Sequence, residues 1–143
     1  MEKNKLFLID AMAMIYRAFY AMNKSPRINS KGLDTSAAFG FFNTLLSLLK
    51  QYKPTHIGIA FDLHGPTFRH KEFADYKSNR QATPDEIRQM EPYIRDIIDA
   101  MHIPILSSEG YEADDVIGTL AKQAAKQGFE VYMVTPDKDY AQL

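Results

Sequence analysis

Cysteine is absent from the 143 residues, which excludes thiolate metal sites and cysteine nucleophiles. The absence also fits a reducing compartment, so we expect a cytoplasmic protein. Apolar runs are short, as in Val131–Val134, and none approaches the roughly 20 residues that span a bilayer. The N-terminal residues 1–5 lead straight into a strand-like run, without the apolar region and cleavage site of a signal peptide. These absences predict a protein with no membrane partner.

Several catalytic and ligand-binding motifs are missing as well. The glycine patterns of P-loop and dinucleotide-binding proteins do not occur, nor does the Gly-x-Ser-x-Gly pattern of a serine nucleophile. The four histidines lack the spacing of zinc ligands, and we expect His56 within a strand and His102 at a helix end. Nucleotide cofactors, serine hydrolysis and a histidine zinc site are therefore disfavoured.

The chain also has no large excess of positive or negative charge, because its net charge is only −1. The hydrophobic fraction of 45% and the charged fraction of 24% are ordinary for a globular domain. The distribution is uneven, however. Residues 64–80 contain four lysines and arginines but two acids, whereas acids gather at 112–115 and 137–139. The near-neutral total thus hides separate positive and negative regions.

Apolar runs and helical periodicity alternate along the chain, which predicts an α/β fold. Short apolar runs predict four strands, at 5–9, 55–61, 103–106 and 129–135. Helical periodicity predicts helices at 11–22, about 35–52, 83–101 and 112–127. This order favours a parallel sheet flanked by helices on both faces, with strand order 3-2-1-4. Because the chain stops soon after the fourth strand, we expect a domain truncated at that point.

Two of these helices carry more specific predictions. The helix at 35–52 should bury an apolar stripe made of Phe39, Phe42, Leu45, Leu46 and Leu49. The helix at 83–101 should begin with a Thr83 cap followed by Pro84. Pro92 removes an amide from its middle, so a kink or a split is expected there.

Carboxylates follow three of the four predicted strands. Asp10 follows the first strand, Asp62 the second, and Asp137 and Asp139 the fourth. The carboxyl ends of parallel strands meet at one edge of the sheet, where ligands bind. The helix that opens on the same edge carries further acids in its first turn, at Glu112, Asp114 and Asp115. Seven carboxylates could therefore converge on one region.

Each acidic group alone also has a structural explanation. An aspartate at a strand end often starts a turn, and acids in a first helical turn serve as caps or face the helix dipole. Together, however, so many carboxylates would repel one another unless cations neutralised them. Oxygen ligands select Mg²⁺ or Mn²⁺, and two such ions roughly 3.5–4 Å apart are the usual arrangement for phosphodiester hydrolysis.

The segment at 63–82 shows neither strand nor helix periodicity and interleaves aromatic with basic residues. It is longer than an ordinary loop, and such segments are usually functional or mobile. Cations can neutralise phosphates and aromatic rings can stack on unpaired bases, although a solvated loop would have the same composition. Arg17, within two turns of Asp10, could hold a phosphate or could be an ordinary surface residue.

These stretches together resemble the 5′-nuclease domain of bacterial DNA polymerase I, in the flap-endonuclease superfamily. The resemblance covers nearly the whole chain and rests on stretches in family order. They are Leu8-Ile9-Asp10, Tyr16-Arg17-Ala18-Phe19-Tyr20, Phe61-Asp62, Phe68-Arg69-His70, Tyr76-Lys77-Ser78-Asn79-Arg80, Gly110-Tyr111-Glu112-Ala113-Asp114-Asp115 and Thr135-Pro136-Asp137-Lys138-Asp139.

The resemblance implies a PIN-like 5′-nuclease core over 1–143, with 63–92 as the helical arch through or under which a 5′ strand passes. It implies a two-metal 5′–3′ exonuclease and flap endonuclease, using Mg²⁺ or Mn²⁺, that acts in DNA replication and repair. Its partners would be 5′ flaps, nicks, branched duplexes, RNA–DNA primer junctions and a polymerase region of the same parent chain. The implied metal ligands are Asp10, Asp62, Glu112, Asp114, Asp115, Asp137 and Asp139, and the implied DNA contacts are Arg17, Arg69, Tyr76, Lys77 and Arg80.

Members of this family carry further aspartates and a helix-hairpin element downstream of the matched region. We therefore expect this chain by itself to bind metal but to cleave weakly or not at all. Two alternatives remain from the residues alone. A phospho-aspartate enzyme would use Asp10 or Asp137 covalently, although Ala11-Met12 does not supply the second acid of that class. A non-catalytic module that binds DNA would not need so many carboxylates.

Overall fold

The computed structural model of the chain describes residues 4–22, 25–61, 83–108, 110–134 and 141–142. They form a five-stranded sheet in the order β3-β2-β1-β4-β5. Neighbours among the first four strands run parallel, and β5 is antiparallel to β4. The strands are β1 (Lys5–Asp10), β2 (His56–Ala60), β3 (Ile105–Leu106), β4 (Glu130–Val134) and β5 (Ala141–Gln142). The predicted order of the first four strands is confirmed.

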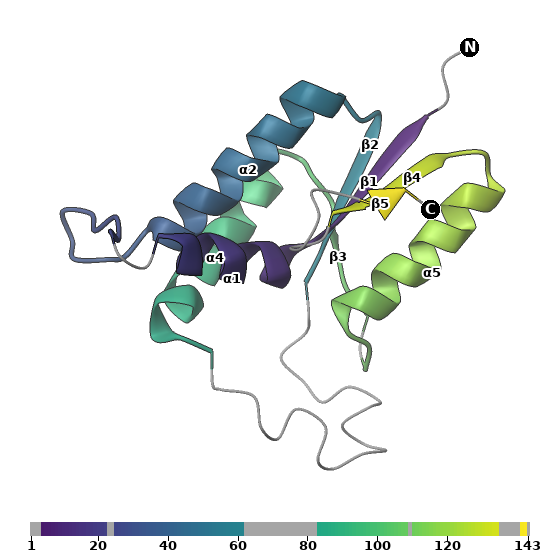
Figure 1. Cartoon of the computed structure of the whole chain (residues 1–143). Helices are drawn as coiled ribbons and strands as arrows, with labels where there is room; N and C mark the ends of the chain where they lie inside the picture. The colour runs from purple at the N-terminus through teal and green to yellow at the C-terminus, as the bar shows by residue number, and fades with distance from the viewer. Residues whose placement is uncertain (1–3, 23–24, 62–82, 109, 135–140, 143) are drawn as a thin grey trace.

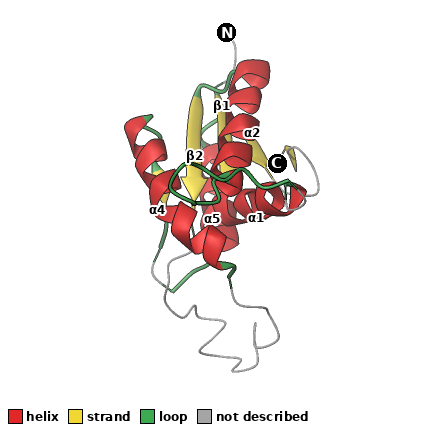
Figure 2. Ribbon diagram, turned by 90° about the vertical axis from the view of Figure 1, so that its left-hand side faces the viewer, coloured by secondary structure: helices red, strands yellow, loops and turns green. Residues whose placement is uncertain are grey.

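Helices cover both faces of the sheet, as predicted (Figures 1 and 2). The described helices are α1 (Ala11–Ala21), α2 (Ser36–Tyr52), α4 (Asp85–Ala100) and α5 (Ala113–Lys126). One apolar core joins the sheet to α1, α2 and α4, and a second joins it to α5. Within β1, Phe7 and Ile9 point into the first core and Leu8 into the second. Burial on both faces explains why this strand is a continuous apolar run.

The buried face of α2 differs from the predicted stripe. Leu45 is buried as expected, but Phe39 is 41% exposed and Leu46 is 54% exposed. Phe41 and Leu48 are buried instead. Apolar residues surround most of this helix, so periodicity alone could not choose a face. Packing of α2 against α1 made the choice, and two predicted core positions were wrong.

The start and the middle of α4 also differ from prediction. Pro84, rather than Thr83, is the capping residue, because its carbonyl accepts from the amides of Ile87 (3.1 Å) and Arg88 (3.1 Å). The helix continues through Pro92 without a break. Of the kink or split expected at Pro92, the split is therefore absent. Burial of the Ile94 and Ile98 side chains on the C-terminal side of the proline stabilises the continuous helix.

The two edges of the sheet differ from the prediction. One edge strand is shorter than predicted, and the other edge has an additional strand. The predicted strand at 103–106 is reduced to β3, although the Pro104 carbonyl still accepts from the amide of Ile59 at 3.1 Å. Proline has no amide to donate, which suits an edge strand. The chain was expected to end after four strands, but β5 extends the sheet beyond β4. A strand of two residues gives no readable alternation, so it could not be predicted.

Most of the segment predicted as an arch lies outside the described residues, which resume at Thr83. From Asp85 the same 63–92 segment belongs to α4, where Ile87 and Met90 are buried. No described helix is both long enough and apolar enough to cross a membrane.

Candidate functional site

The carboxyl edge of the sheet collects the ends of three neighbouring strands. β1 lies between β2 and β4, with Asp10 paired with Ala60 and Ile9 with Val134. Asp62 comes two residues after Ala60, and Asp137 comes three residues after Val134. The strands that lead to these two aspartates therefore flank the strand that ends in Asp10. Asp62, Asp137 and Asp139 themselves lie outside the described residues.

Asp10 stands where β1 passes directly into α1. It is the last residue of the strand and also the cap of the helix, and its Oδ1 accepts from the amide of Ala13 at 3.2 Å. The side chain is partly buried. A carboxylate has two oxygens with several lone pairs, so a helix-capping role and a ligand role are chemically compatible. The cap bond to Ala13 thus helps to fix Asp10 at the carboxyl edge of the sheet.

Glu112 and Asp115 form a capping box at the start of α5. The Glu112 amide donates to Asp115 Oδ2 at 3.1 Å, and the Glu112 side chain accepts from the Asp115 amide in return. Glu112 is only 8% exposed and its Oε1 atom is buried. Because α5 follows β3, its N-terminus lies at the same edge as Asp10. The capping explanation for these acids is therefore correct, and it is compatible with a ligand role for Glu112.

Asp114 is exposed in the first turn of α5, next to this capping box. Among the described residues, no three acidic or histidine side chains are placed so that they could hold a metal ion. Asp10, Glu112 and Asp114 lie at the carboxyl edge, and the acids predicted to join them after β2 and β4 lie outside the described residues. The available donors are all carboxylate oxygens, which is the donor set that suits Mg²⁺ or Mn²⁺.

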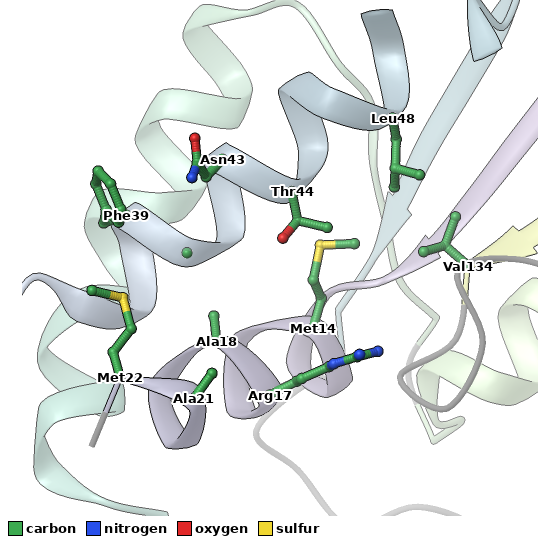
Figure 3. A pocket seen from close by; sticks show the side chains of 11 residues that line it. Met14, Arg17, Ala18, Ala21, Met22, Phe39, Asn43, Thr44, Leu48 and Val134 are labelled. Atoms are coloured by element: carbon green, nitrogen blue, oxygen red, sulfur yellow. The ribbon is translucent and has the colours of Figure 1, made fainter. Parts of the chain in front are cut away.

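Arg17 lies on α1, close to the end of β4. Its side chain and Val134 both line a cavity of about 320 Å³ between α1 and α2, together with Met14 and Leu48 (Figure 3). This places an exposed guanidinium beside the strand that leads to Asp137. The phosphate contact of Arg17 stays a prediction. The other predicted DNA contacts lie outside the described residues, at Arg69, Tyr76, Lys77 and Arg80.

A partly buried ion pair lies beside the end of β2, just before Asp62 in the sequence. Arg95 Nε donates to Glu91 Oε2 at 3.2 Å, and the guanidinium lies over the Phe61 ring at 4.1 Å from its centroid. Phe61 is 1% exposed and Glu91 is 8% exposed. This pair was not predicted from the sequence. A signal did exist, because Glu91 shares the apolar face of α4 with Ile87 and Ile94.

A second contact that the sequence could not reveal joins α1 to the start of α4. The Tyr16 hydroxyl donates to Thr83 Oγ1 at 3.0 Å, although the two residues are 67 positions apart. The Arg88 guanidinium donates to the Thr83 carbonyl through Nη2 at 2.9 Å and Nε at 3.2 Å. Thr83 is therefore held through both its side chain and its backbone. No pattern of residue spacing predicts such a contact.

Comparison with known proteins agrees with this geometry. Residues 5–143 match the family model of the 5′–3′ exonuclease, N-terminal resolvase-like domain. The chain is 48% identical to DNA polymerase I of Bacillus subtilis (strain 168) over 143 residues, covering 99% of the chain and 16% of that protein. It is 45% identical to DNA polymerase I of Geobacillus stearothermophilus over 142 residues, again with 99% and 16% covered. The chain thus spans about one sixth of the curated relatives that it matches.

Solved structures share the fold. The T5 5′-exonuclease with bound zinc superposes with a TM-score of 0.67 at 21% identity, covering 92% of this chain and 49% of that one. The bacteriophage T5 flap endonuclease in complex with DNA and metal ions gives a TM-score of 0.65 at 22% identity, with 92% and 48% covered. The match of the family model over residues 5–143 is decisive, and the chain belongs to the 5′–3′ exonuclease family as its N-terminal resolvase-like domain.

Proposed function

We propose that this chain is part of a metal-dependent 5′–3′ exonuclease and flap endonuclease, within a DNA polymerase I that serves DNA replication and repair. The observation that carries the proposal is the arrangement of strand ends. β2, β1 and β4 are adjacent and parallel, and the sequence places an aspartate at or just beyond the carboxyl end of each. The N-terminus of α5 brings Glu112 and Asp114 to the same edge. As part of this proposal, the protein acts in the bacterial cytoplasm, where the chromosome lies.

The carboxylates would hold Mg²⁺ or Mn²⁺ in this proposal. Asp10, Asp62, Glu112 and Asp114 would provide one site, and Asp115, Asp137 and Asp139 would contribute to a second. When bound, such ions activate a water molecule and stabilise the leaving oxygen of a phosphodiester. The chain's own residues position the DNA: Arg17, Arg69, Lys77 and Arg80 would bind phosphates, and Tyr76 would stack on a base. The substrates would be 5′ flaps, nicks, branched duplexes and RNA–DNA junctions.

Cleavage of a labelled 5′-flap oligonucleotide by the full-length protein with Mg²⁺ tests the proposal. We expect Asp10→Asn to abolish cleavage, although asparagine preserves the helix cap of α1. Asp99→Asn is the matched control, because this exposed acid lies in the last turn of α4 and is not among the proposed ligands. The substitution should leave cleavage unchanged. Chelation of divalent ions should also stop cleavage in the wild type.

Two results would contradict the proposal. Cleavage that survives either Asp10→Asn or chelation would show that the carboxylates do not hold a catalytic metal. Flap binding without any cleavage by the full-length protein would instead favour a non-catalytic DNA-binding module. Parallel reactions with this chain and with a form extended at its C-terminus measure whether the 143 residues cleave a flap by themselves. We expect weak or no cleavage by the shorter form, because the family has downstream aspartates.

A further inference from the structure

We infer that Asp115 is a positioning residue that holds Glu112 in the orientation needed to bind a cation. The inference rests on the proposed function, which makes Glu112 a ligand of one metal ion, and it adds to the part that Asp115 has in the second site. The Glu112 amide donates to Asp115 Oδ2 at 3.1 Å. This hydrogen bond therefore connects the ligand sets of the two proposed sites.

Asp115 is bonded to Glu112 on both sides of the Glu112 α-carbon. On the N-terminal side, the Glu112 amide donates to the Asp115 carboxylate. On the C-terminal side, the Glu112 carbonyl accepts from the amides of Asp115 at 3.1 Å and Val116 at 3.2 Å. These bonds fix both peptide groups around Glu112, whose backbone is extended at φ −83° and ψ 164°. The backbone in turn sets the direction in which the Glu112 side chain leaves it.

The bond to the Asp115 carboxylate acts on the side of Glu112 where the apolar core gives less support. Ala113, directly after Glu112, is 2% exposed and packs in the second core. Tyr111, directly before it, is 50% exposed, and Gly110 has a left-handed φ of 82°. The core thus anchors the chain from Ala113 onward, and the bond to Asp115 extends this anchoring to the Glu112 amide.

Capping of α5 by itself does not account for this arrangement. Serine, threonine, aspartate and asparagine are the preferred capping residues, and glutamate is not among them. Glu112 is also 8% exposed with a buried Oε1 atom, and burial of a carboxylate costs free energy unless cations or hydrogen bonds compensate. A metal ligand needs such a buried and fixed position, which neighbours hydrogen-bonded to the ligand usually provide. Asp115 is such a neighbour of Glu112.

Two substitutions separate the hydrogen bond from the charge. Asp115→Asn and Asp115→Ala both remove the negative charge, but only asparagine keeps an oxygen that can accept from the Glu112 amide. The dissociation constant of the tightest Mn²⁺ site should be about 10- to 100-fold higher in Asp115→Ala than in Asp115→Asn, the usual cost of losing a hydrogen-bonded neighbour of a ligand. Calorimetric titration of the protein with Mn²⁺ measures this ratio. In the full-length protein, Asp115→Ala should also need more Mn²⁺ than Asp115→Asn for half-maximal flap cleavage.

Ile117→Val is the matched control, because Ile117 is 4% exposed on the same helix and packs in the second core. Ile117→Val and Asp115→Ala should both lower the melting temperature, but of the two only Asp115→Ala should weaken Mn²⁺ binding. Equal Mn²⁺ affinity of Asp115→Asn and Asp115→Ala would overturn the inference, and so would weaker binding in Ile117→Val. A full-length wild-type protein that cuts no flap would overturn the proposed function and this inference together. Active wild type with equal Asp115 variants overturns the inference alone.

Discussion

At the scale of single residues, the acids at the carboxyl edge combine structural and proposed catalytic roles. Asp10 caps α1, and Asp115 closes the capping box with the Glu112 amide. A carboxylate in the first turn of a helix is stabilised by amides and by the helix dipole, whatever else it binds. The two explanations that the sequence left open are therefore compatible. Helix starts hold these acids in place, and this fixed placement is what a metal site requires.

The Glu91–Arg95 pair gives a prediction at the same scale. Arg95→Met removes the charge that faces buried Glu91 but retains an apolar cover for the Phe61 ring. The free energy of unfolding should fall by about 1–3 kcal/mol, because buried Glu91 loses a charge-assisted hydrogen bond. Arg88→Met removes an exposed pair with Asp85, whose side chains are 60% and 81% exposed, and the two exposed hydrogen bonds to the Thr83 carbonyl. Its effect on unfolding should stay below about 1 kcal/mol. Urea denaturation measures both, and equal losses would contradict the distinction.

At the scale of elements, the close contact of α1 and α2 depends on one glycine. A Cβ atom placed on Gly40 would lie 2.6 Å from the Cβ of Ala18, closer than two non-bonded carbon atoms can approach. Packing of these helices buries Phe41 and Leu45 and sets which face of α2 is inside. Periodicity wrongly placed Phe39 and Leu46 inside because it considers one helix at a time, whereas the neighbouring helix decides which side chains are buried.

Gly40→Ala should therefore destabilise the protein by about 1–3 kcal/mol, the usual cost of an overpacked core. Gly118→Ala is the matched control in the middle of α5, where an added Cβ would meet nothing within 4 Å. There the same change should stabilise the protein by roughly 0.5–1 kcal/mol, because alanine favours the helix. Thermal unfolding of the two variants should shift in opposite directions. A shift in the same direction would show that helix propensity, and not the α1–α2 contact, dominates at Gly40.

At the scale of the whole molecule, the sheet order brings together acids that are distant in sequence. Asp10 and Glu112 are separated by roughly 100 residues, yet both lie at the carboxyl edge. The proposed ligands carry charge of one sign, so the folded state without cations contains mutual repulsion. A cation that binds the folded site and not the unfolded chain relieves this repulsion and stabilises the fold by mass action.

Mg²⁺ or Mn²⁺ should therefore raise the melting temperature in a concentration-dependent manner. A free cation concentration of one hundred times the dissociation constant should raise the free energy of unfolding by about 2.7 kcal/mol. Asp10→Asn should retain the stability of the metal-free protein, because asparagine caps a helix as well as aspartate does, and should lose most of the metal-induced shift. Asp99→Asn should keep the full shift. Differential scanning calorimetry with increasing Mn²⁺ distinguishes the two, and an undiminished shift in Asp10→Asn would show that this residue is not a ligand.

The sequence by itself determined the α/β class, the parallel order of the first four strands and the helices on both faces. It also placed Asp10 at the end of the first strand, since each of these features depends on local periodicity and on the handedness of the crossover. Only the tertiary structure decided the buried face of α2, the continuity of α4 through Pro92, the short edge strand β5 and the contacts Glu91–Arg95 and Tyr16–Thr83. Each of these depends on which surfaces meet after folding. The local sequence of one element does not specify which other element will pack against it.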